Sequence, residues 1–290
     1  MIDLDVSKFF DSIDHELLMK ALHKHTTNPW VLLYVRRWIS CPYQLDDGSL
    51  IVREQGVPQG SVIGPMLANL FLHYAFDEWM KRNYPDVPFE RYADDIICHC
   101  PTIGRSKRVL SSIKNRLQAC KLALNEEKTR IVYCKDSNRK FEYDVIQFDF
   151  LGYTFRPRHV MSQKGEYFTG FNPAVSNASL KKISRQIRSW NVNQWVGWSI
   201  SLEEIAEKIN PVIRGWINYY GKFYPTILRQ HFRYVDLRLS AWVRTKFKRF
   251  RRYKTRSIYW LGKIARQNPA LFAHWEWGYK PPAGKEYTAA

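Results

Sequence analysis

The sequence predicts an α+β domain with a mostly antiparallel sheet and packed helices, followed by an all-helical module. In the first half, short β-branched segments alternate with amphipathic helical segments, without the uniform rhythm of a doubly wound fold. From about residue 174 onward the apolar residues recur at helical spacing. We therefore expect a first domain over residues 1–157, a connector over 158–173 and a helical domain over 174–290.

Local signals place the individual elements. Asp14 precedes an amphipathic run as a helix cap, and Pro29 and Pro65 suit the first turns of two further helices. Asp46-Asp47-Gly48 predicts the turn of a hairpin. Helices are expected at residues 15–25, 29–40, 65–82, 105–122, 179–190, 201–223 and 228–250. Strands are expected at residues 1–6, within 41–57, on both sides of Asp94-Asp95, and at 128–134 and 147–155.

The net charge of +18 is carried entirely by the second half of the chain. Residues 1–150 hold 20 basic and 20 acidic side chains, whereas residues 151–290 hold 25 and 7, together with 8 of the 11 tryptophans. Basic side chains interleaved with aromatic ones favour a nucleic-acid partner over a solvated surface, which usually mixes both signs. A run of about 18 apolar residues does not occur, so no membrane span is expected. The five scattered cysteines favour a reducing, intracellular setting.

Carboxylates stand at the ends of the predicted strands. Asp5 ends the first strand, and Asp94 and Asp95 form a tight turn between two others. Carboxylates held close together repel one another, and a divalent cation relieves that repulsion. Mg²⁺ prefers carboxylate, water and phosphate oxygens. An Asp-Asp pair alone is more often a hydrated turn, so the flanking residues decide between the two interpretations.

The flanking residues form an ordered series of motifs that resembles a known family. Tyr92-Ala93-Asp94-Asp95 resembles the YxDD signature of reverse transcriptases, in the YADD form typical of group II intron-encoded enzymes. The other matching blocks, in order, are DVSKFFD (5–11), GVPQGS (56–61), EKT (127–129), FLGY (150–153) and residues 209–220 of the maturase, or X, region. The chain thus resembles a bacterial group II intron reverse transcriptase–maturase. The resemblance implies a polymerase palm, with part of the fingers, over residues 1–157 and a thumb and maturase module over 174–290.

The resemblance implies a catalytic metal centre. Asp5, Asp94 and Asp95 would be its catalytic, metal-binding carboxylates, and the backbone carbonyl of Val6 would add an oxygen ligand. Two Mg²⁺ ions are implied, with Mn²⁺ as a substitute. They would lower the pKa of the primer 3′-hydroxyl and stabilise the transferring phosphate.

Further positions would bind substrate. Phe10 stands where the family has the ring that excludes a 2′-hydroxyl, although a core phenylalanine is the alternative. Gln59 would contact the nucleotide sugar, and Gly56 and Gly60 would let the backbone approach the ligand. Lys128 either neutralises the leaving pyrophosphate or is a solvated lysine; the two interpretations are equally open. Leu151, Gly152 and Tyr153 would grip the primer end.

The basic half is expected to bind the duplex and structured RNA. Phe232, Leu239, Trp242 and Val243 would form the packed side of a long helix. The expected phosphate contacts are Arg229 and Arg233 on one face, and Arg244, Lys248 and Arg252 on another. The region 246–256 adds to this surface, because seven of its eleven residues are Lys or Arg.

The sequence predicts neither a zinc site at its cysteine–histidine segment nor a nuclease domain at its C-terminus. Cys98, His99 and Cys100 are consecutive along a predicted strand, so the two cysteines share one face and His99 points away from it. That spacing is poor for zinc. The C-terminus lacks the paired cysteines and histidines of an appended nuclease, so no DNA endonuclease domain is expected.

The resemblance also implies partners and a place in the cell. Group II intron RNA, an RNA template with a DNA or RNA primer, dNTPs and a DNA target would be bound, in a cytoplasmic ribonucleoprotein of a bacterium. The chain begins inside the Asp5 block, so the family's preceding fingers segments are expected to be absent. A non-catalytic splicing cofactor that binds intron RNA therefore remains the alternative function. A reverse transcriptase of defence or diversity generation is less favoured, because of the maturase-like block.

Overall fold

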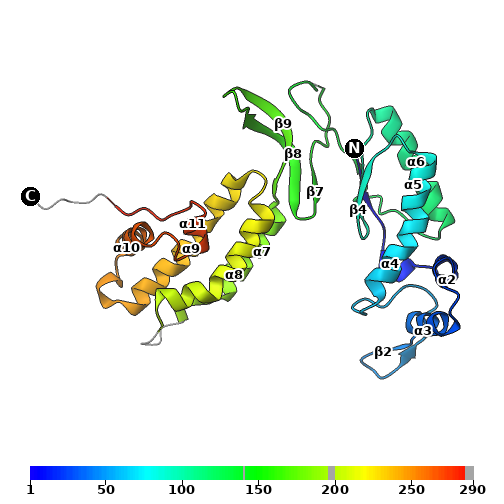
Figure 1. The fold of residues 1–290 in the computed structure, drawn as a ribbon, viewed down its shortest axis with the longest axis horizontal. Coiled ribbons are helices and arrows are strands. Elements are labelled where there is room, and N and C mark those ends of the chain that lie inside the picture. The colour runs from blue at the N-terminus through cyan, green and yellow to red at the C-terminus, as the bar shows by residue number, and fades with distance from the viewer. Residues whose placement is uncertain (140, 195–199, 285–290) are drawn as a thin grey trace, which may run out of the picture. The chain divides into compact units, whose positions relative to one another are not determined.

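The computed structural model describes residues 1–139, 141–194 and 200–284, and the chain divides into two compact units. The first unit holds residues 1–134 and 141–146, and the second holds residues 135–140 and 147–290 (Figure 1). Each unit has its own cluster of buried apolar side chains. Within the described ranges, no helix is both long and apolar enough to cross a bilayer.

The first unit is built on an antiparallel sheet with the strand order β4-β5-β1-β6. Its strands are β1 (Ile2–Asp5), β4 (Phe89–Tyr92), β5 (Asp95–Cys98) and β6 (Arg130–Ile131). In β1, Ile2 and Leu4 are fully buried, whereas Asp5 ends the strand half-buried. The alternation follows from the period of two in a strand, which sends every second side chain into the core.

Helices form in all four segments predicted for the first unit, and α1 is an additional short helix that was not predicted. They are α1 (Phe9–Ser12), α2 (His15–Leu22), α3 (Pro29–Ile39), α4 (Gly64–Leu72), α5 (Glu78–Asn83) and α6 (Ile103–Ala119). The predicted hairpin is present as β2 (Tyr43–Gln44) and β3 (Leu50–Ile51). The α+β class expected for this part of the chain is confirmed.

Asp14 caps α2, as its position before the amphipathic run predicts. Its carboxylate accepts a hydrogen bond from the Leu17 N–H at 2.9 Å and pairs with the Lys121 ammonium at 2.6 Å. Partial burial alone would raise the pKa of Asp14, but Lys121 and the Leu17 N–H outweigh it and hold the pKa below its usual value.

Asp14→Ala is expected to lower the free energy of unfolding by about 1 kcal/mol at neutral pH, because a helix cap is lost. The folded pKa lies below the unfolded one, so the stabilisation is present above the unfolded value and disappears as pH falls through the folded value. Denaturant unfolding at about pH 7 and about pH 2.5 measures this difference. A loss of stability equal at both pH values, or as large in Asp86→Ala, would contradict this role.

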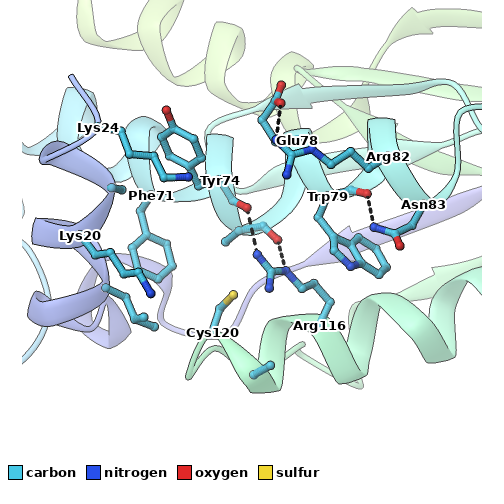
Figure 2. A pocket seen from close by; sticks show the side chains of 14 residues that line it. Lys20, Lys24, Phe71, Tyr74, Glu78, Trp79, Arg82, Asn83, Arg116 and Cys120 are labelled. Carbon is cyan, nitrogen blue, oxygen red and sulfur yellow. Dashed lines mark hydrogen bonds and ion pairs between the residues drawn. The ribbon is translucent and has the colours of Figure 1, made fainter.

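The long helix predicted over residues 65–82 contains a π-helical segment. The turn η1 (His73–Asp77) separates α4 from α5 and leaves main-chain carbonyls out of the α-helical ladder. Arg116 of α6 donates to two of them, the carbonyls of Tyr74 at 3.0 Å and Ala75 at 2.9 Å. Figure 2 shows this guanidinium beside a cavity of about 390 Å³ between the helices. A partner distant in sequence thus stabilises the irregular turn.

Arg116→Ala is expected to lower the free energy of unfolding of the first unit by about 2 kcal/mol, since two charge-assisted hydrogen bonds to main-chain carbonyls are lost. Chemical denaturation followed by circular dichroism measures the change. Arg108→Ala, an exposed arginine on the same helix, is the matched control. Equal stabilities of the two variants would show that Arg116 does not support the π-helical turn.

The second unit opens with a sheet in the order β7-β8-β9. The strands β7 (Phe148–Phe150), β8 (Tyr153–Met161) and β9 (Tyr167–Val175) are antiparallel. The structure differs here from the prediction, because residues 158–173, expected as a connector, form most of the β8–β9 hairpin. The strand expected over 147–155 is likewise two strands joined by a turn at Leu151-Gly152.

The rest of the second unit is helical, as predicted from residue 174 onward. Its elements are α7 (Asn177–Ser189), η2 (Val192–Gln194), α8 (Leu202–Tyr220), α9 (Pro225–Lys246), η3 (Lys248–Phe250), α10 (Lys254–Gln267) and α11 (Ala273–Glu276). The predicted packed side of α9 is confirmed: Phe232, Leu239, Trp242 and Val243 are buried. Residues 285–290, part of the C-terminal stretch that predicts no nuclease domain, lie outside the described residues.

Candidate active site

The sheet of the first unit brings the predicted carboxylates together. Strands β1 and β5 pair so that Asp5 lies directly opposite Asp95, the last pair of the ladder. Side chains of directly opposed residues lie on the same face with Cβ atoms about 5 Å apart. Asp94 precedes Asp95 in the turn, so all three carboxylates belong to one end of the sheet.

The turn that carries Asp94 is held in an unusual backbone conformation. Tyr92 pairs with Asp95, so Ala93 and Asp94 form a two-residue hairpin loop. Ala93 has φ +53°, in the left-handed region that is unfavourable for residues with a Cβ. Such a residue costs about 1–3 kcal/mol and persists only where the surrounding structure enforces it.

Arg91 holds the turn in this conformation. No role for Arg91 was predicted from the sequence. Its guanidinium makes a two-pronged ion pair with the Asp77 carboxylate, at 2.7 and 2.6 Å, in which both side chains are nearly buried. It also donates to the Asn69 side-chain oxygen at 2.8 Å and to the Ala93 carbonyl at 3.1 Å. Arg91 therefore ties the strained turn to the helical layer. Its signal was its place three residues before Asp94, beside an aromatic.

The backbone of Asp5 is fixed from the opposite side. The Asp5 carbonyl accepts a hydrogen bond from the Asn125 N–H at 2.8 Å, and the Asp5 N–H contacts the Thr129 hydroxyl at 3.4 Å. Val6 and Leu124 form an antiparallel bridge, and the hydrogen bonds on this side join their neighbours: the Ser7 N–H donates to the Ala123 carbonyl, and the Asn125 N–H donates to the Asp5 carbonyl. The carbonyl of Val6 therefore points away from Leu124, toward the β5 side of β1.

Lys128 lies at the carboxylates rather than on a remote edge. Its ammonium is 3.5 Å from an Asp5 carboxylate oxygen, and its side chain is largely exposed. A cation there partly offsets the negative charge of Asp5 and remains accessible to an anionic ligand. The position keeps both earlier interpretations of Lys128 open.

The electrostatics of Asp95 follow from this geometry. Loss of hydration raises the pKa of Asp95, and the negative charges of Asp94 and Asp5 raise it further, while Lys128 opposes them. The site concentrates like charge at the exposed end of a sheet, which is unfavourable without a counter-ion.

The donor set fits a divalent cation. Within the part of the chain that the structure describes, no three His, Cys, Asp or Glu side chains are already arranged around a common metal position. The available oxygens are nevertheless those that Mg²⁺ binds, with room for the water and phosphate oxygens that complete its shell. Directly opposed residues on adjacent strands have Cβ atoms about 5 Å apart, which is within the span of two carboxylates that bind one ion.

Phe10 and the 56–61 loop form the neighbouring surface. The Val57 N–H donates to the Phe10 carbonyl at 2.7 Å, so the loop is joined directly to α1. Phe10 is partly exposed and packs edge-on to the buried Phe9 at 5.5 Å between ring centroids. Gln59 is exposed and its amide lies 3.4 Å from an Asp11 oxygen. Phe10 and Gln59 thus belong to segments that are joined at the backbone, and Gln59 reaches Asp11, the residue after Phe10.

The two glycines of this loop differ in their surroundings. Gly60 has φ +85° and open space around its missing side chain, which suits an approach of a ligand. Gly56 has φ +82°, but a Cβ there would lie 2.8 Å from the main-chain oxygen of Asp11. Gly56 therefore serves the packing of the loop against α1, and the expectation that it lets a ligand approach is not supported.

The predicted primer-grip residues lie in the second unit, at the turn between β7 and β8. Leu151 has φ +49° and Gly152 has φ +80°. The Tyr153 hydroxyl donates to the carbonyl of Tyr219, and the Tyr219 hydroxyl donates to the Leu151 carbonyl at 2.9 Å. FLGY and the maturase-like block, far apart in sequence, thus meet.

The basic residues are only partly arranged as predicted. Arg229 and Arg233 are exposed one turn apart on α9, with Arg229 over the Trp277 ring at 4.9 Å. The expectation that Arg244, Lys248 and Arg252 share a helix face is wrong, since α9 ends at Lys246. The extended Phe247 ends it and packs its ring against Trp242 and Trp260.

The remaining basic side chains then follow separate paths. Lys248 lies in η3, and Arg252 lies in the turn before α10, both exposed. Arg244 is half-buried and donates to the Ser240 carbonyl at 3.3 Å. The region 246–256 is therefore a folded basic surface rather than a straight ridge.

The cysteine–histidine segment begins at Cys98, the last residue of β5, and its side chains make other contacts. Cys98 is buried in the core, and burial raises the pKa of its thiol. His99 pairs with the Glu90 carboxylate on β4. These contacts serve the sheet itself.

The first unit thus carries three carboxylates at one end of an antiparallel sheet, and comparisons with known proteins give its class and family. A model of the reverse transcriptase (RNA-dependent DNA polymerase) family matches residues 1–155, and a model of the group II intron maturase-specific domain matches residues 166–260. The chain belongs to the reverse transcriptase family of RNA-directed DNA polymerases, a family that depends on divalent metal ions, and it carries the maturase-specific domain of group II introns.

Individual relatives are distant. Protein YkfC of Escherichia coli is 26% identical over 172 residues, covering 47% of this chain and 44% of its own length. The putative COX1/OXI3 intron 1 protein of Saccharomyces cerevisiae is 22% identical over 194 residues, covering 48% and 23%. A solved telomerase of Candida albicans, in complex with a telomeric RNA fragment, is 14% identical with a TM-score of 0.46, covering 95% of this chain and 48% of its own. The chain thus spans less than half the length of these relatives.

Proposed function

We propose that this chain is the catalytic core of a group II intron reverse transcriptase that extends a primer on an RNA template and also assists intron splicing. The observation that carries the proposal is the register that sets Asp5 opposite Asp95, beside the strained turn at Ala93. Residues 1–157 are assigned to the palm, and residues 174–290 to the thumb and maturase module.

The side chains divide the work. Asp5, Asp94, Asp95 and the Val6 carbonyl would hold two metal ions. When bound, Mg²⁺, or Mn²⁺ in its place, supplies positive charge that lowers the pKa of the primer 3′-hydroxyl and neutralises the transferring phosphate. Lys128 presents its ammonium to the departing pyrophosphate. Gln59 and Gly60 orient the incoming nucleotide, and Leu151, Gly152 and Tyr153 hold the primer end.

Phe10 is proposed to exclude ribonucleotides, because its ring is partly exposed and its main-chain carbonyl is bonded to the loop that carries Gln59. Phe10→Ala is expected to raise the kcat/KM for rNTPs relative to dNTPs by about tenfold or more, since a 2′-hydroxyl no longer meets the ring. Single-nucleotide incorporation measures the ratio. Phe141→Ala, a strongly exposed phenylalanine in the same unit, is the control. A general loss of activity without a changed ratio would make Phe10 a packing residue.

Primer extension tests the polymerase proposal. Purified protein is incubated with a primed RNA template, dNTPs and Mg²⁺ or Mn²⁺, and the products are resolved by length. Extension that requires both the RNA template and the metal supports the proposal. Absence of extension with every divalent metal would overturn it.

The maturase-specific domain and the basic charge of residues 151–290 favour the second role. Arg229, Arg233, Arg244, Lys248 and Arg252 are proposed to contact intron RNA and the duplex, within a cytoplasmic bacterial ribonucleoprotein that also engages a DNA target. A protein with both Asp94 and Asp95 replaced by Asn is expected to retain splicing assistance. Loss of splicing assistance in this variant would show that splicing depends on the two carboxylates. If the variant assists splicing and the wild type never extends a primer, the chain acts as a splicing cofactor alone.

A further inference from the structure

The turn between β7 and β8 is strained. Phe150 pairs with Tyr153, so Leu151 and Gly152 are the two central residues of the hairpin. Both have positive φ, the pattern of a type I′ turn. Asn, Asp and Gly are the usual residues there, and a leucine in the left-handed region costs about 1–3 kcal/mol. Something outside the hairpin must enforce this conformation.

Hydrogen bonds from two helices supply that restraint. The Tyr219 hydroxyl, near the end of α8, donates to the Leu151 carbonyl at 2.9 Å. The Ser179 hydroxyl of α7 donates to the Gly152 carbonyl at 2.9 Å, and the Ser176 N–H donates to the same oxygen at 2.9 Å. Both carbonyls of the turn are therefore bound from outside the hairpin.

Tyr220 completes the restraint from the next position of α8. Its hydroxyl donates to the Ser179 hydroxyl at 3.2 Å, which relays the contact to Gly152. A Cβ on Gly152 would lie 2.9 Å from the Ser179 oxygen and 3.0 Å from the Tyr220 oxygen. The glycine is thus required by close approach as well as by its positive φ.

An aromatic cluster fixes the tyrosines themselves. Tyr153 packs its ring against Tyr219, Tyr220 and Phe223, with centroids 5.5–5.7 Å apart. Tyr219 and Tyr220 meet edge to face at 4.7 Å. Tyr153 follows the turn directly, and the other rings lie at the end of α8 or just beyond it, so the cluster packs the hairpin against this end of the helix.

We propose that Tyr219, Tyr220 and Ser179 are positioning residues for the turn at Leu151-Gly152, so that the end of α8 sets how firmly this turn holds a primer–template duplex. The inference rests on the proposed function, which places the primer end at this turn. It adds that a segment matched by the maturase-specific domain controls the grip.

Tyr219→Phe removes one hydroxyl and keeps the ring. Hydrogen–deuterium exchange of the peptide covering residues 148–155 is expected to quicken about threefold to tenfold, the effect of one neutral hydrogen bond. Affinity for a primed RNA template, measured by fluorescence anisotropy without metal, is expected to fall by a similar factor. The KM for dNTP is expected to stay within about twofold, because the nucleotide site lies in the first unit. Tyr167→Phe, a tyrosine 80% exposed on β9, is the matched control.

If Tyr219→Phe unfolds the second unit, the same measurements are made on a second variant, Ser179→Ala. Unchanged exchange at residues 148–155 would overturn the proposal, as would faster exchange with unchanged duplex affinity. A wild-type protein that binds the duplex but never extends it would overturn the polymerase function and leave the positioning result standing.

Discussion

Asp95→Asn is expected to abolish primer extension, with the rate of nucleotide incorporation falling by about a thousandfold or more. The substitution keeps the shape of the side chain and removes the negative charge that would bind the metal ion. Removal of one transition-state contact of this kind costs about 100-fold to 1,000-fold, and loss of a metal ligand acts on both reacting oxygens. Single-turnover incorporation on a primed RNA template measures the loss.

The same variant is expected to be at least as stable as the wild type. The pKa of Asp95 is raised in the folded protein by lost hydration and by Asp94 and Asp5, so its ionisation opposes folding at neutral pH. Asp86→Asn, on a carboxylate outside this cluster, is the matched control and should retain activity. Unimpaired extension by Asp95→Asn would exclude the carboxylate from catalysis.

Arg91→Ala is expected to lower the free energy of unfolding of the first unit by about 3 kcal/mol, because the nearly buried Asp77 carboxylate loses its arginine partner and is left with His73 at 3.6 Å. It also frees the Ala93 carbonyl, so the strained turn relaxes and incorporation falls with it. Denaturant unfolding and single-nucleotide incorporation measure the two effects.

Two further variants separate charge from geometry. Arg91→Lys keeps the charge but loses the planar fork, so intermediate stability and low activity are expected. Arg82→Ala removes an exposed arginine and should change neither quantity. Full activity in Arg91→Ala would show that the turn needs no support from this side chain.

Much of the first unit was predictable from local chemistry. Strand alternation around Asp5, the Asp14 cap and the prolines at helix starts each act within a few residues, and each is confirmed. The convergence of Asp5 with Asp95 was expected from the ordered motifs. The register that places them opposite one another is a property of the assembled sheet.

The missed features depend on partners distant in sequence. The π-helical turn at residues 73–77 relies on Arg116, and the conformation of Ala93 relies on Arg91 reaching across to Asp77. Arg116 has no local signal, and the position of Arg91 shortly before Asp94 does not identify Asp77 as its partner. Leu151 at positive φ is similar, because a leucine predicts an ordinary strand until Tyr219 is known to bind its carbonyl.

The β8–β9 hairpin was missed for a different reason. Pro157 and Pro173 usually argue against a strand, since proline donates no hydrogen bond. In the structure β9 is the outer strand, and β7 pairs only with residues 153–155 of β8. Pro157 thus lies beyond the stretch paired with β7, and Pro173 lies in an outer strand, where prolines are tolerated. The helix α9 ends earlier than predicted because the ring of Phe247 packs against Trp242, a contact that the sequence pattern does not reveal.

Direct measurement of metal binding tests the central claim most sharply. Mn²⁺ is titrated by electron paramagnetic resonance into protein that holds a primed RNA template with a 3′-deoxy terminus and the matching dNTP. Tight Mn²⁺ binding by the wild type, lost in both Asp5→Asn and Asp95→Asn but kept in Asp86→Asn, is the predicted result. Equal Mn²⁺ binding by the wild type and Asp5→Asn would contradict a metal site shared between β1 and the 94–95 turn.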